Sequence, residues 1–409
     1  MTTQLTSSPL FLNPDAPRLV DLAGFGPPDR GPLDYHAKLP GYAVTPLVDL
    51  PDVAARLGVG RVVVKDEAER LDLPSYKILG ASWATYQEVL ATLQPDLQPW
   101  STMAELAEQL APYGRRRLVA ATDGNHGRAV ARMARHLGWE ATIFVPTGTV
   151  DARIEGIASE GAEVVVVDGT YDEAVERAAQ EADDRSLVIS DTAWPGYERV
   201  PRWVVEGYST LFNEADDAMA AQGVPPVTHV SIQVGVGALA AAAVRRYRAT
   251  EASAGVTMIG VEPVTAACVL ESMEAGALVD VPGPHDSIMA GLNCGRPSPL
   301  AWPLVRNGLH AAIAVDDDRA RQAMRLLAAG GVVSGESGAA GLAGLLALVD
   351  EHPEAAAQLG LDGDAVVLLV NTEGATDPVN YERVVARTAE EVLRARRSHD
   401  ESVNEAVSP

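Results

Sequence analysis

The chain is organised around the stretch Leu71-Asp72-Leu73-Pro74-Ser75-Tyr76-Lys77-Ile78-Leu79-Gly80. It follows a β-branched run at residues 61–65, which predicts a buried strand. It leads into an apolar stretch from Ile78 to Leu93, which predicts a helix. Lys77 therefore stands at a helix N-terminus, where desolvation and the positive end of the helix dipole both favour a neutral amine. A neutral amine can attack a carbonyl carbon; the alternative interpretation is a lysine whose ammonium reaches water from the helix start.

The composition indicates a globular protein with an acidic surface. The chain has 409 residues, 47% of them hydrophobic, which is enough for one large domain or two. Its 32 basic and 56 acidic side chains give a net charge of −24, which argues against nucleic acids and anionic membranes as partners. No apolar run is long enough to cross a membrane. The N-terminus has neither the basic region nor the apolar core of a signal peptide, so we expect a cytoplasmic protein.

The two cysteines, Cys268 and Cys294, are too few for a disulfide scaffold or a cysteine-based zinc site, and no metal site is expected. They are either two buried thiols in a reducing compartment or the two halves of a single disulfide. The sequence leaves both interpretations open.

Strands and helices alternate from Leu118 onward, which predicts parallel sheets with right-handed crossovers. A long amphipathic helix at about residues 200–221 separates two such series. We therefore predict two α/β domains, a larger one from residues 1–88 and 215–409 and a smaller inserted one from residues 89–214. The polar tail at residues 398–409 is predicted to be disordered.

Polar and glycine-rich turns follow several of the predicted strands. The turn at residues 122–127, Thr-Asp-Gly-Asn-His-Gly, lies between a strand and a helix, where converging backbone N–H groups can hold an anion. Asp123 in this turn is a potential base. Alternatively, Asp123 or Asn125 simply caps the helix.

Two further turns also follow predicted strands. The turn at residues 233–240 has the small residues of a phosphate cradle, although a Gly-x-Gly turn can also serve only close helix packing. The last predicted strand ends in a polar cluster at residues 370–378, in which Thr372 supplies a hydroxyl. Asp377 and Pro378 in this cluster can equally be a helix N-cap and its first residue.

Taken together, these turns and the lysine resemble a known family. The similar stretches are residues 75–77, 121–128, 191–194, 235–238, 289–295 and 372–378, and the resemblance runs from about residue 40 to 390. The chain resembles the fold type II pyridoxal-phosphate enzymes, the group of tryptophan synthase β and threonine dehydratase, and most closely the diaminopropionate ammonia-lyase family. The Thr-Asp-Gly-Asn-His-Gly form is the discriminating one, because the wider group usually has Ser-Ser-Gly-Asn-His. Ala129 and Ala375 depart from the family pattern, where a glycine and an acid are usual.

The resemblance implies an α/β fold with two open, twisted, mostly parallel sheets flanked by helices. It places pyridoxal 5'-phosphate in the cleft between the domains. Lys77 would hold the cofactor through its amine, Asn125 would contact the ring oxygen and Thr372 would face the pyridine nitrogen. The larger domain would bind the cofactor, and its phosphate would be held by Gly235, Val236, Gly237, Ala238 and Leu239.

The resemblance also implies residues that act on the substrate. The catalytic residues would be Lys77, Asp123 and Asp191, although Asp191 can also be interpreted as the cap of a turn. Substrate contacts would come from Tyr76, Thr122, Asp123 and His126, with backbone groups of residues 122–126 binding the carboxylate.

The implied reaction is α,β-elimination of ammonia from 2,3-diaminopropionate, which gives aminoacrylate and then pyruvate and ammonia. A lysine and a nearby carboxylate suit it, because one proton leaves Cα while the departing nitrogen must be protonated. The alternatives are elimination or β-replacement on another β-substituted amino acid, as in serine or threonine dehydratases and biosynthetic enzymes, and a regulator that binds an amino acid without turnover. The implied partner is a small amino-acid substrate, and the implied assembly is a homodimer.

Overall fold

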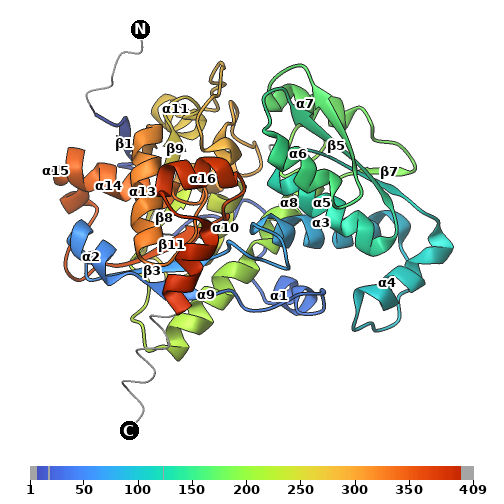
Figure 1. The fold of residues 1–409 in the computed structure, drawn as a ribbon, viewed down its shortest axis with the longest axis horizontal. Coiled ribbons are helices and arrows are strands. Elements are labelled where there is room, and N and C mark those ends of the chain that lie inside the picture. The colour runs from blue at the N-terminus through green and yellow to red at the C-terminus, as the bar shows by residue number, and fades with distance from the viewer. Residues whose placement is uncertain (1–6, 17–18, 123, 398–409) are drawn as a thin grey trace.

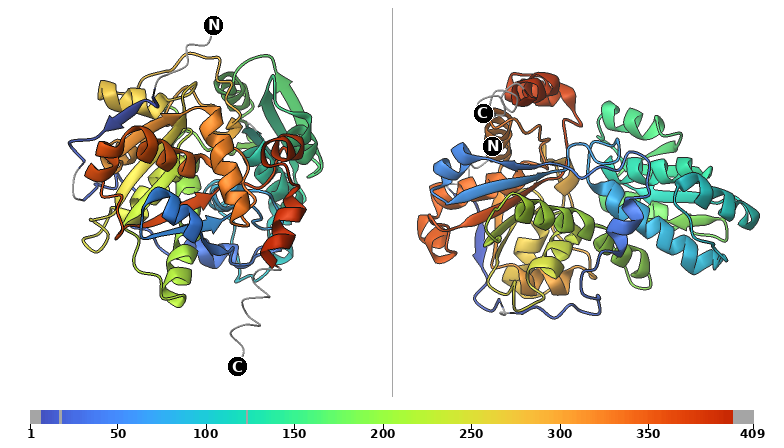
Figure 2. Two further views of the ribbon diagram at one scale, coloured as in Figure 1. Left: turned by 60° about the vertical axis from the view of Figure 1, so that its left-hand side comes forward. Right: turned by 90° about the horizontal axis from the view of Figure 1, so that it is seen from below.

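The computed structural model describes residues 7–16, 19–122 and 124–397. Asp123 and the predicted tail at residues 398–409 therefore lie outside the described residues. The described residues form two separate β-sheets, each flanked by helices (Figure 1). In the right-hand view of Figure 2, the part with the smaller sheet stands beside the part with the larger one. The prediction of two mostly parallel sheets flanked by helices is confirmed.

The larger sheet has the strand order β1-β10-β9-β8-β11-β3-β2. Its central strands are parallel, and they are β10 (Ala311–Val315), β9 (Thr257–Pro263), β8 (His229–Gln233), β11 (Val366–Asn371) and β3 (Arg61–Asp66). The strands at the two edges are antiparallel to their neighbours, and they are β1 (Leu10–Leu12) and β2 (Leu47–Asp49). Because both faces of the central strands are covered by helices, these strands are continuous apolar runs in the sequence.

The smaller sheet is parallel throughout its described strands, β6 (Glu163–Val167), β5 (Glu140–Pro146), β4 (Arg117–Ala121) and β7 (Ser186–Val188). Alternate residues of β4 point to opposite faces, as the strand geometry requires. Leu118 and Ala120 belong to the core that contains α5 (Asn125–Leu137), whereas Val119 and Ala121 pack with α7 (Tyr171–Ala179). The smaller sheet therefore also carries helices on both faces.

Helices cover the larger sheet in the same way. On one face α10 (Ala238–Tyr247) shares a core with Val230 and Ile232 of β8, and on the other α14 (Ala340–Glu351) packs with Ile259 of β9. The remaining helices are α1 (Gly31–His36), α2 (Pro51–Leu57), α3 (Lys77–Leu93), α4 (Met103–Leu110), α6 (Asp151–Ala158), α8 (Arg199–Gly207), α9 (Ser209–Ala221), α11 (Cys268–Ala275), α12 (Trp302–Gly308), α13 (Asp317–Ala329), α15 (Pro353–Gln358) and α16 (Pro378–Val385). None of the described helices has the length and apolar character needed to span a membrane.

Two segments differ from the sequence prediction. The single helix expected at about residues 200–221 is two helices, α8 and α9, which meet at the buried Tyr208 where Gly207 touches the backbone of α3. The sequence also predicts one helix over about residues 379–396, and it is divided, because Ala386 adopts a left-handed conformation with a φ of 59° and ends α16. Helix resumes at residue 389.

The predicted site residues follow the carboxyl ends of strands in both sheets. Lys77 comes after β3, the glycine turn after β8 and Thr372 after β11, while Asn125 follows β4 and Asp191 follows β7. The predicted domain boundaries at residues 88 and 214 fall within α3 and α9, and the division into domains stays a prediction.

Candidate active site

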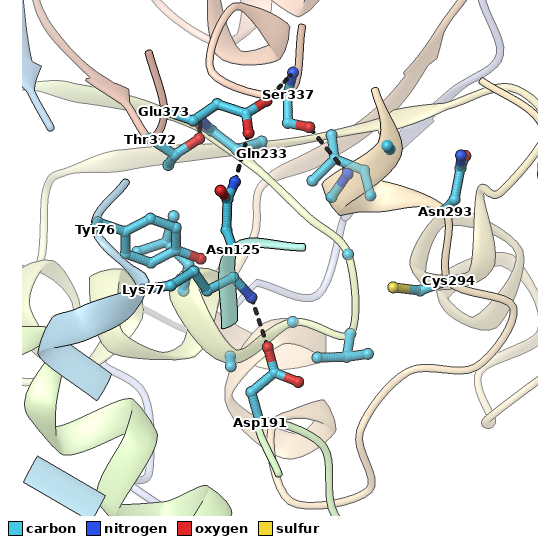
Figure 3. Close-up of a pocket in the computed structure, with 18 of the residues that line it drawn as sticks. Tyr76, Lys77, Asn125, Asp191, Gln233, Asn293, Cys294, Ser337, Thr372 and Glu373 are labelled. Atoms are coloured by element: carbon cyan, nitrogen blue, oxygen red, sulfur yellow. Dashed lines mark hydrogen bonds and ion pairs between the residues drawn. The ribbon is translucent and has the colours of Figure 1, made fainter. Parts of the chain in front are cut away.

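A pocket lies where these strand ends converge. The predicted residues that line this pocket are Tyr76, Lys77, Asn125, Asp191, Thr372 and the turn at residues 235–239. Figure 3 shows side chains from both parts of the chain pointing into this pocket. A cavity of about 700 Å³ adjoins it, and Tyr171, Ala290 and Asn293 line both.

Lys77 is the first residue of α3, and two contacts position it. The backbone N–H of Tyr76 donates to the carbonyl of Thr372 at 3.2 Å, which ties the start of α3 to the end of β11. Three residues on, Gly80 lies against α8: a Cβ there would stand 2.6 Å from Tyr208 Cε1 and 2.8 Å from Val204 Cγ1. The predicted position of Lys77 at a helix N-terminus is confirmed.

Asp191 is the ion-pair partner of Lys77, at 2.5 Å from Nζ to Oδ2. Tyr171 Oη donates to the other carboxylate oxygen at 3.0 Å, and His126 Nδ1 lies 4.0 Å from Oδ2. Burial by itself raises the pKa of Asp191, but the charges of Lys77 and His126 and the hydrogen bonds from Lys77 and Tyr171 outweigh it and hold that pKa well below its usual range.

This ion pair adds a contact of Lys77 that the sequence prediction did not include. The sequence pattern accounts for desolvation and for the helix dipole. It does not show that a residue 114 positions away places a carboxylate beside Nζ. An opposite charge at that distance favours the charged form of the amine.

Asn125 joins the two parts of the chain at the pocket. Its Nδ2 donates to Glu373 Oε2 at 2.6 Å (Figure 3). The backbone N–H of Ser337 donates to Glu373 Oε1 at 3.0 Å, so both carboxylate oxygens are engaged. Glu373 is 1% exposed.

Thr372 presents its hydroxyl to the pocket beside Gln233, the last residue of β8. Gln233 Nε2 donates to Thr372 Oγ1 at 2.9 Å. The side chain of Thr372 is 4% exposed and that of Gln233 is 3% exposed, so this hydrogen bond is protected from water.

The glycine turn after β8 is shaped to hold an anion. Gly237 has a φ of 97°, a conformation that residues with a Cβ rarely adopt, and α10 begins at the next residue. A Cβ on Gly235 would lie 3.1 Å from the carbonyl oxygen of Gly291 and 3.3 Å from Cys294 Sγ, so a side chain there would crowd both atoms. The first N–H groups of a helix have no partner within the helix, and here they face the pocket. A phosphate group fits this turn.

Not every predicted residue lines the pocket. Within the described lining, Thr122 and His126 are not included. Thr122 Oγ1 instead accepts from the N–H of Gly124 at 2.8 Å, and His126 Nε2 donates to the carbonyl of Ile189 at 2.8 Å. Asp123 lies outside the described residues.

Pocket residues that were missed as site residues from the sequence include Gln233, Glu373, Tyr171 and Ser337. The first two stand inside the quoted turns, where the polar residues that flank the glycines were the available signal. Tyr171 is the first residue of α7 and stands outside the quoted turns. Ser337 belongs to Ser-Gly-Glu-Ser-Gly at residues 334–338, whose glycines before a helix resemble those of the other turns.

The cysteines and potential metal ligands add no further centre. Cys268 and Cys294 are both buried and are not joined in a disulfide, and Cys294 lines the pocket. In the part of the chain that the structure describes, no three His, Cys, Asp or Glu side chains are grouped to hold a metal ion.

Comparisons with known proteins agree with this site. Residues 38–373 match the family of pyridoxal-phosphate dependent enzymes. Diaminopropionate ammonia-lyase from Escherichia coli K12 is 39% identical over 363 residues, which cover 86% of this chain and 89% of that protein. The enzyme of the same name from Salmonella typhimurium LT2 is 39% identical over 368 residues, 86% of this chain and 90% of the relative.

Among solved structures, diaminopropionate ammonia-lyase from Escherichia coli in complex with D-serine has a TM-score of 0.82 and 35% sequence identity to this chain. The match covers 93% of this chain and 97% of that one. The fold and nearly the whole length are therefore shared. The chain belongs to the pyridoxal-phosphate dependent enzymes and, within them, to the diaminopropionate ammonia-lyase family.

Proposed function

We propose that this chain uses pyridoxal phosphate to eliminate ammonia from 2,3-diaminopropionate, with pyruvate and ammonia as final products. The observation that carries this proposal is the ion pair between Lys77 and Asp191, at 2.5 Å, in a pocket bounded by a glycine turn. Sequence identity of 39% to diaminopropionate ammonia-lyases over most of their length supports the choice of substrate.

The cofactor would be held by residues of both parts of the chain. The N–H groups of residues 235–239 would bind the phosphate, and Lys77 would hold the aldehyde carbon. Asn125 Nδ2 has two hydrogens, of which Glu373 takes one, so the second is available for the ring oxygen. Thr372 would face the pyridine nitrogen. Bound pyridoxal phosphate supplies an electron sink for the negative charge that develops at Cα.

Two groups would act during the elimination, Lys77 on a proton and Asp191 through its charge. Lys77 Nζ would take the proton from Cα, and the bond between Cβ and its nitrogen would break as ammonia leaves. Asp191 keeps its negative charge at neutral pH because its pKa is held low. It would therefore balance the charge on Lys77 and attract the second ammonium of the substrate.

The other substrate contacts rest on the resemblance. The loop at residues 122–126 would bind the carboxylate through backbone groups, with Tyr76 and His126 beside it. Asp123 would act near Cα or the leaving amine. The buried hydrogen bond from His126 to the carbonyl of Ile189 holds the end of β7 close to α5.

The cofactor can be tested by absorbance. The purified protein should show the visible band of bound pyridoxal phosphate, and Lys77→Ala should lack it while circular dichroism stays unchanged. A wild-type protein that never shows this band after reconstitution would contradict the proposal.

The substrate is tested by measuring pyruvate release from both enantiomers of diaminopropionate and from serine, threonine and cysteine. We expect the highest kcat/KM with a diaminopropionate enantiomer, because only this substrate offers a second ammonium to a buried carboxylate. A preference for serine or threonine would assign the chain to a dehydratase activity instead.

We further propose a homodimer located in the cytoplasm. Support comes from the family resemblance. Sedimentation velocity at several protein concentrations tests the assembly, and a fluorescent fusion tests the location.

A further inference from the structure

Gln233 makes a set of buried hydrogen bonds that the proposed chemistry does not yet use. Its side-chain amide lies between β8 and β11, and Nε2 donates to Thr372 Oγ1 at 2.9 Å and to the carbonyl of Val370 at 2.9 Å. A third, longer contact of 3.4 Å joins Nε2 to the carbonyl of Gly338. Figure 3 shows Gln233 beside Thr372 and Glu373 at one side of the pocket.

The two backbone carbonyls fix the orientation of this amide. A carbonyl oxygen can only accept a hydrogen bond. If the amide were rotated by 180°, Oε1 would face the oxygens of Val370 and Gly338, and buried acceptors would be left facing each other without a hydrogen. Leaving such groups unpaired in a buried position costs about 1–3 kcal/mol each. The N–H side of Gln233 must therefore face Thr372.

This orientation determines what the Thr372 hydroxyl can do. Because Oγ1 accepts the N–H of Gln233, its own hydrogen is left to be donated elsewhere. Within the described residues, Thr372 Oγ1 takes part in no other hydrogen bond, and it borders the pocket. The nearest carboxylate in sequence, Glu373, is engaged by Asn125 and Ser337. The hydroxyl hydrogen is therefore available to a ligand in the pocket.

We propose that Gln233 is a positioning residue that makes Thr372 a hydrogen-bond donor toward the cofactor. A pyridine nitrogen that receives this hydrogen cannot carry a proton of its own, so Gln233 keeps the ring nitrogen unprotonated. The inference rests on the proposed function, which places this nitrogen at Thr372. Through Gln233, the carbonyls of Val370 and Gly338 would influence the electronic state of the bound cofactor.

The test uses holoenzyme reconstituted with pyridoxal phosphate that carries ¹⁵N in the ring. The ¹⁵N chemical shift separates protonated from unprotonated pyridine, a property that a purely structural role for Gln233 would not change. For the wild type we expect the unprotonated shift, constant through the neutral pH range. A protonated wild-type signal overturns the inference, whatever the variants do.

Two substitutions of Gln233 should change this signal in a graded way. Gln233→Met removes the donor at similar volume, so Thr372 can accept as well as donate, and the signal should move toward the protonated position as the pH falls. Gln233→Glu, buried as the neutral acid, can accept the Thr372 hydrogen and should give the larger shift. An unchanged shift in a folded Gln233→Met holoenzyme overturns the inference.

The matched control is the same substitution in a Thr372→Val background. There the hydroxyl is gone, so Gln233→Met should leave the ¹⁵N shift unaltered. A failure of the inference can be told apart from a failure of the proposed function. In the first case the wild type still binds the cofactor and shows the visible band, and Lys77→Ala lacks that band. In the second case the wild type binds no cofactor.

Discussion

Asp191 is the residue on which the state of Lys77 depends. It is 4% exposed, and its two carboxylate oxygens are engaged by Lys77 at 2.5 Å and by Tyr171 at 3.0 Å. Because its pKa is held well below the usual range, the carboxylate remains charged throughout the neutral range and down to acidic pH. A permanently charged group beside the amine can assist proton transfer without titrating itself.

We predict that Asp191→Asn lowers kcat by about 10²–10⁴-fold, the usual range for loss of a group that assists proton transfer. The substitution keeps the shape of the side chain and removes its charge, so cofactor binding should change much less than turnover. Stopped-flow kinetics with diaminopropionate and a cofactor titration measure the two effects.

The matched control is Tyr171→Phe, which removes the hydrogen bond to Oδ1 and keeps the charge of Asp191. Tyr171→Phe should lower kcat less than Asp191→Asn does. If Asp191→Asn instead abolished cofactor binding and left the turnover of the bound fraction intact, Asp191 would serve attachment rather than proton transfer.

At the scale of elements, the crossing of α3 and α8 fixes the position of Lys77. The two helices meet through glycines: a Cβ on Gly207 would lie 2.4 Å from the carbonyl oxygen of Leu79, and one on Gly80 would lie 2.6 Å from the ring of Tyr208. Tyr208 and Val204 are both fully buried and cannot move aside. Because the two helices are packed this closely, a displacement of α8 would also displace α3 and its first residue, Lys77.

We predict that Gly80→Ala destabilises the protein by about 1–3 kcal/mol, the usual cost of adding atoms to a packed core. The new methyl group would displace the start of α3, so cofactor affinity should fall together with the Tm.

Gly156→Ala in α6 is the control, because its nearest neighbour is the flexible end of Arg128 at 3.3 Å. It should be neutral or stabilising by up to about 1 kcal/mol, since alanine favours helix. Equal Tm values for Gly80→Ala and the wild type would show that the helix contact is not tight.

At the scale of the whole molecule, a buried ionic cluster joins segments that are far apart in the sequence. Lys65 at the end of β3 and Arg70 both bind Glu214 of α9, each at 2.6 Å. Arg70 also binds Glu67 at 2.6 Å, and the Thr45 hydroxyl donates to the Glu67 carboxylate at 2.6 Å. These side chains are almost fully buried, so each charge depends on its partners.

We predict that Glu214→Gln lowers the free energy of unfolding by about 3–5 kcal/mol, because it leaves two cations short of a buried counter-charge. Burial by itself raises the pKa of Glu214, but hydrogen bonds and charges from Arg70 and Lys65 outweigh it and lower that pKa. A lowered carboxyl pKa stabilises the fold above the usual glutamate range, and this stabilisation is lost as the pH falls. The advantage of the wild type over Glu214→Gln should therefore shrink on acidification in denaturant titrations.

Asp217→Asn on the same helix is the control. Asp217 pairs with Arg30 at 2.7 Å, but both side chains are more than half exposed, at 58% and 54%. Its loss should cost less than about 1 kcal/mol. A similar loss in both variants would indicate a change in helix α9 itself rather than in the cluster.

Several parts of the fold and site could be predicted from local patterns. The β-branched run at residues 61–65 is β3, and the apolar stretch after Lys77 is α3, because strand and helix periodicities are written within a few residues. The glycines at positions 235 and 237 marked a turn whose backbone a side chain would obstruct. The division between α8 and α9 was not predicted, since it depends on contact with another helix.

What the sequence by itself determined is the order of elements, the helix start that carries Lys77 and the turns that follow the strands, because these depend on neighbours in the chain. Only the tertiary structure decided which side chains meet. It brought Asp191 to Lys77, Glu373 to Asn125 and Gln233 to Thr372, across 114, 248 and 139 positions of sequence. Charge and hydrogen bonding act over a few ångströms of space, and no local pattern records which distant residues fall within that range.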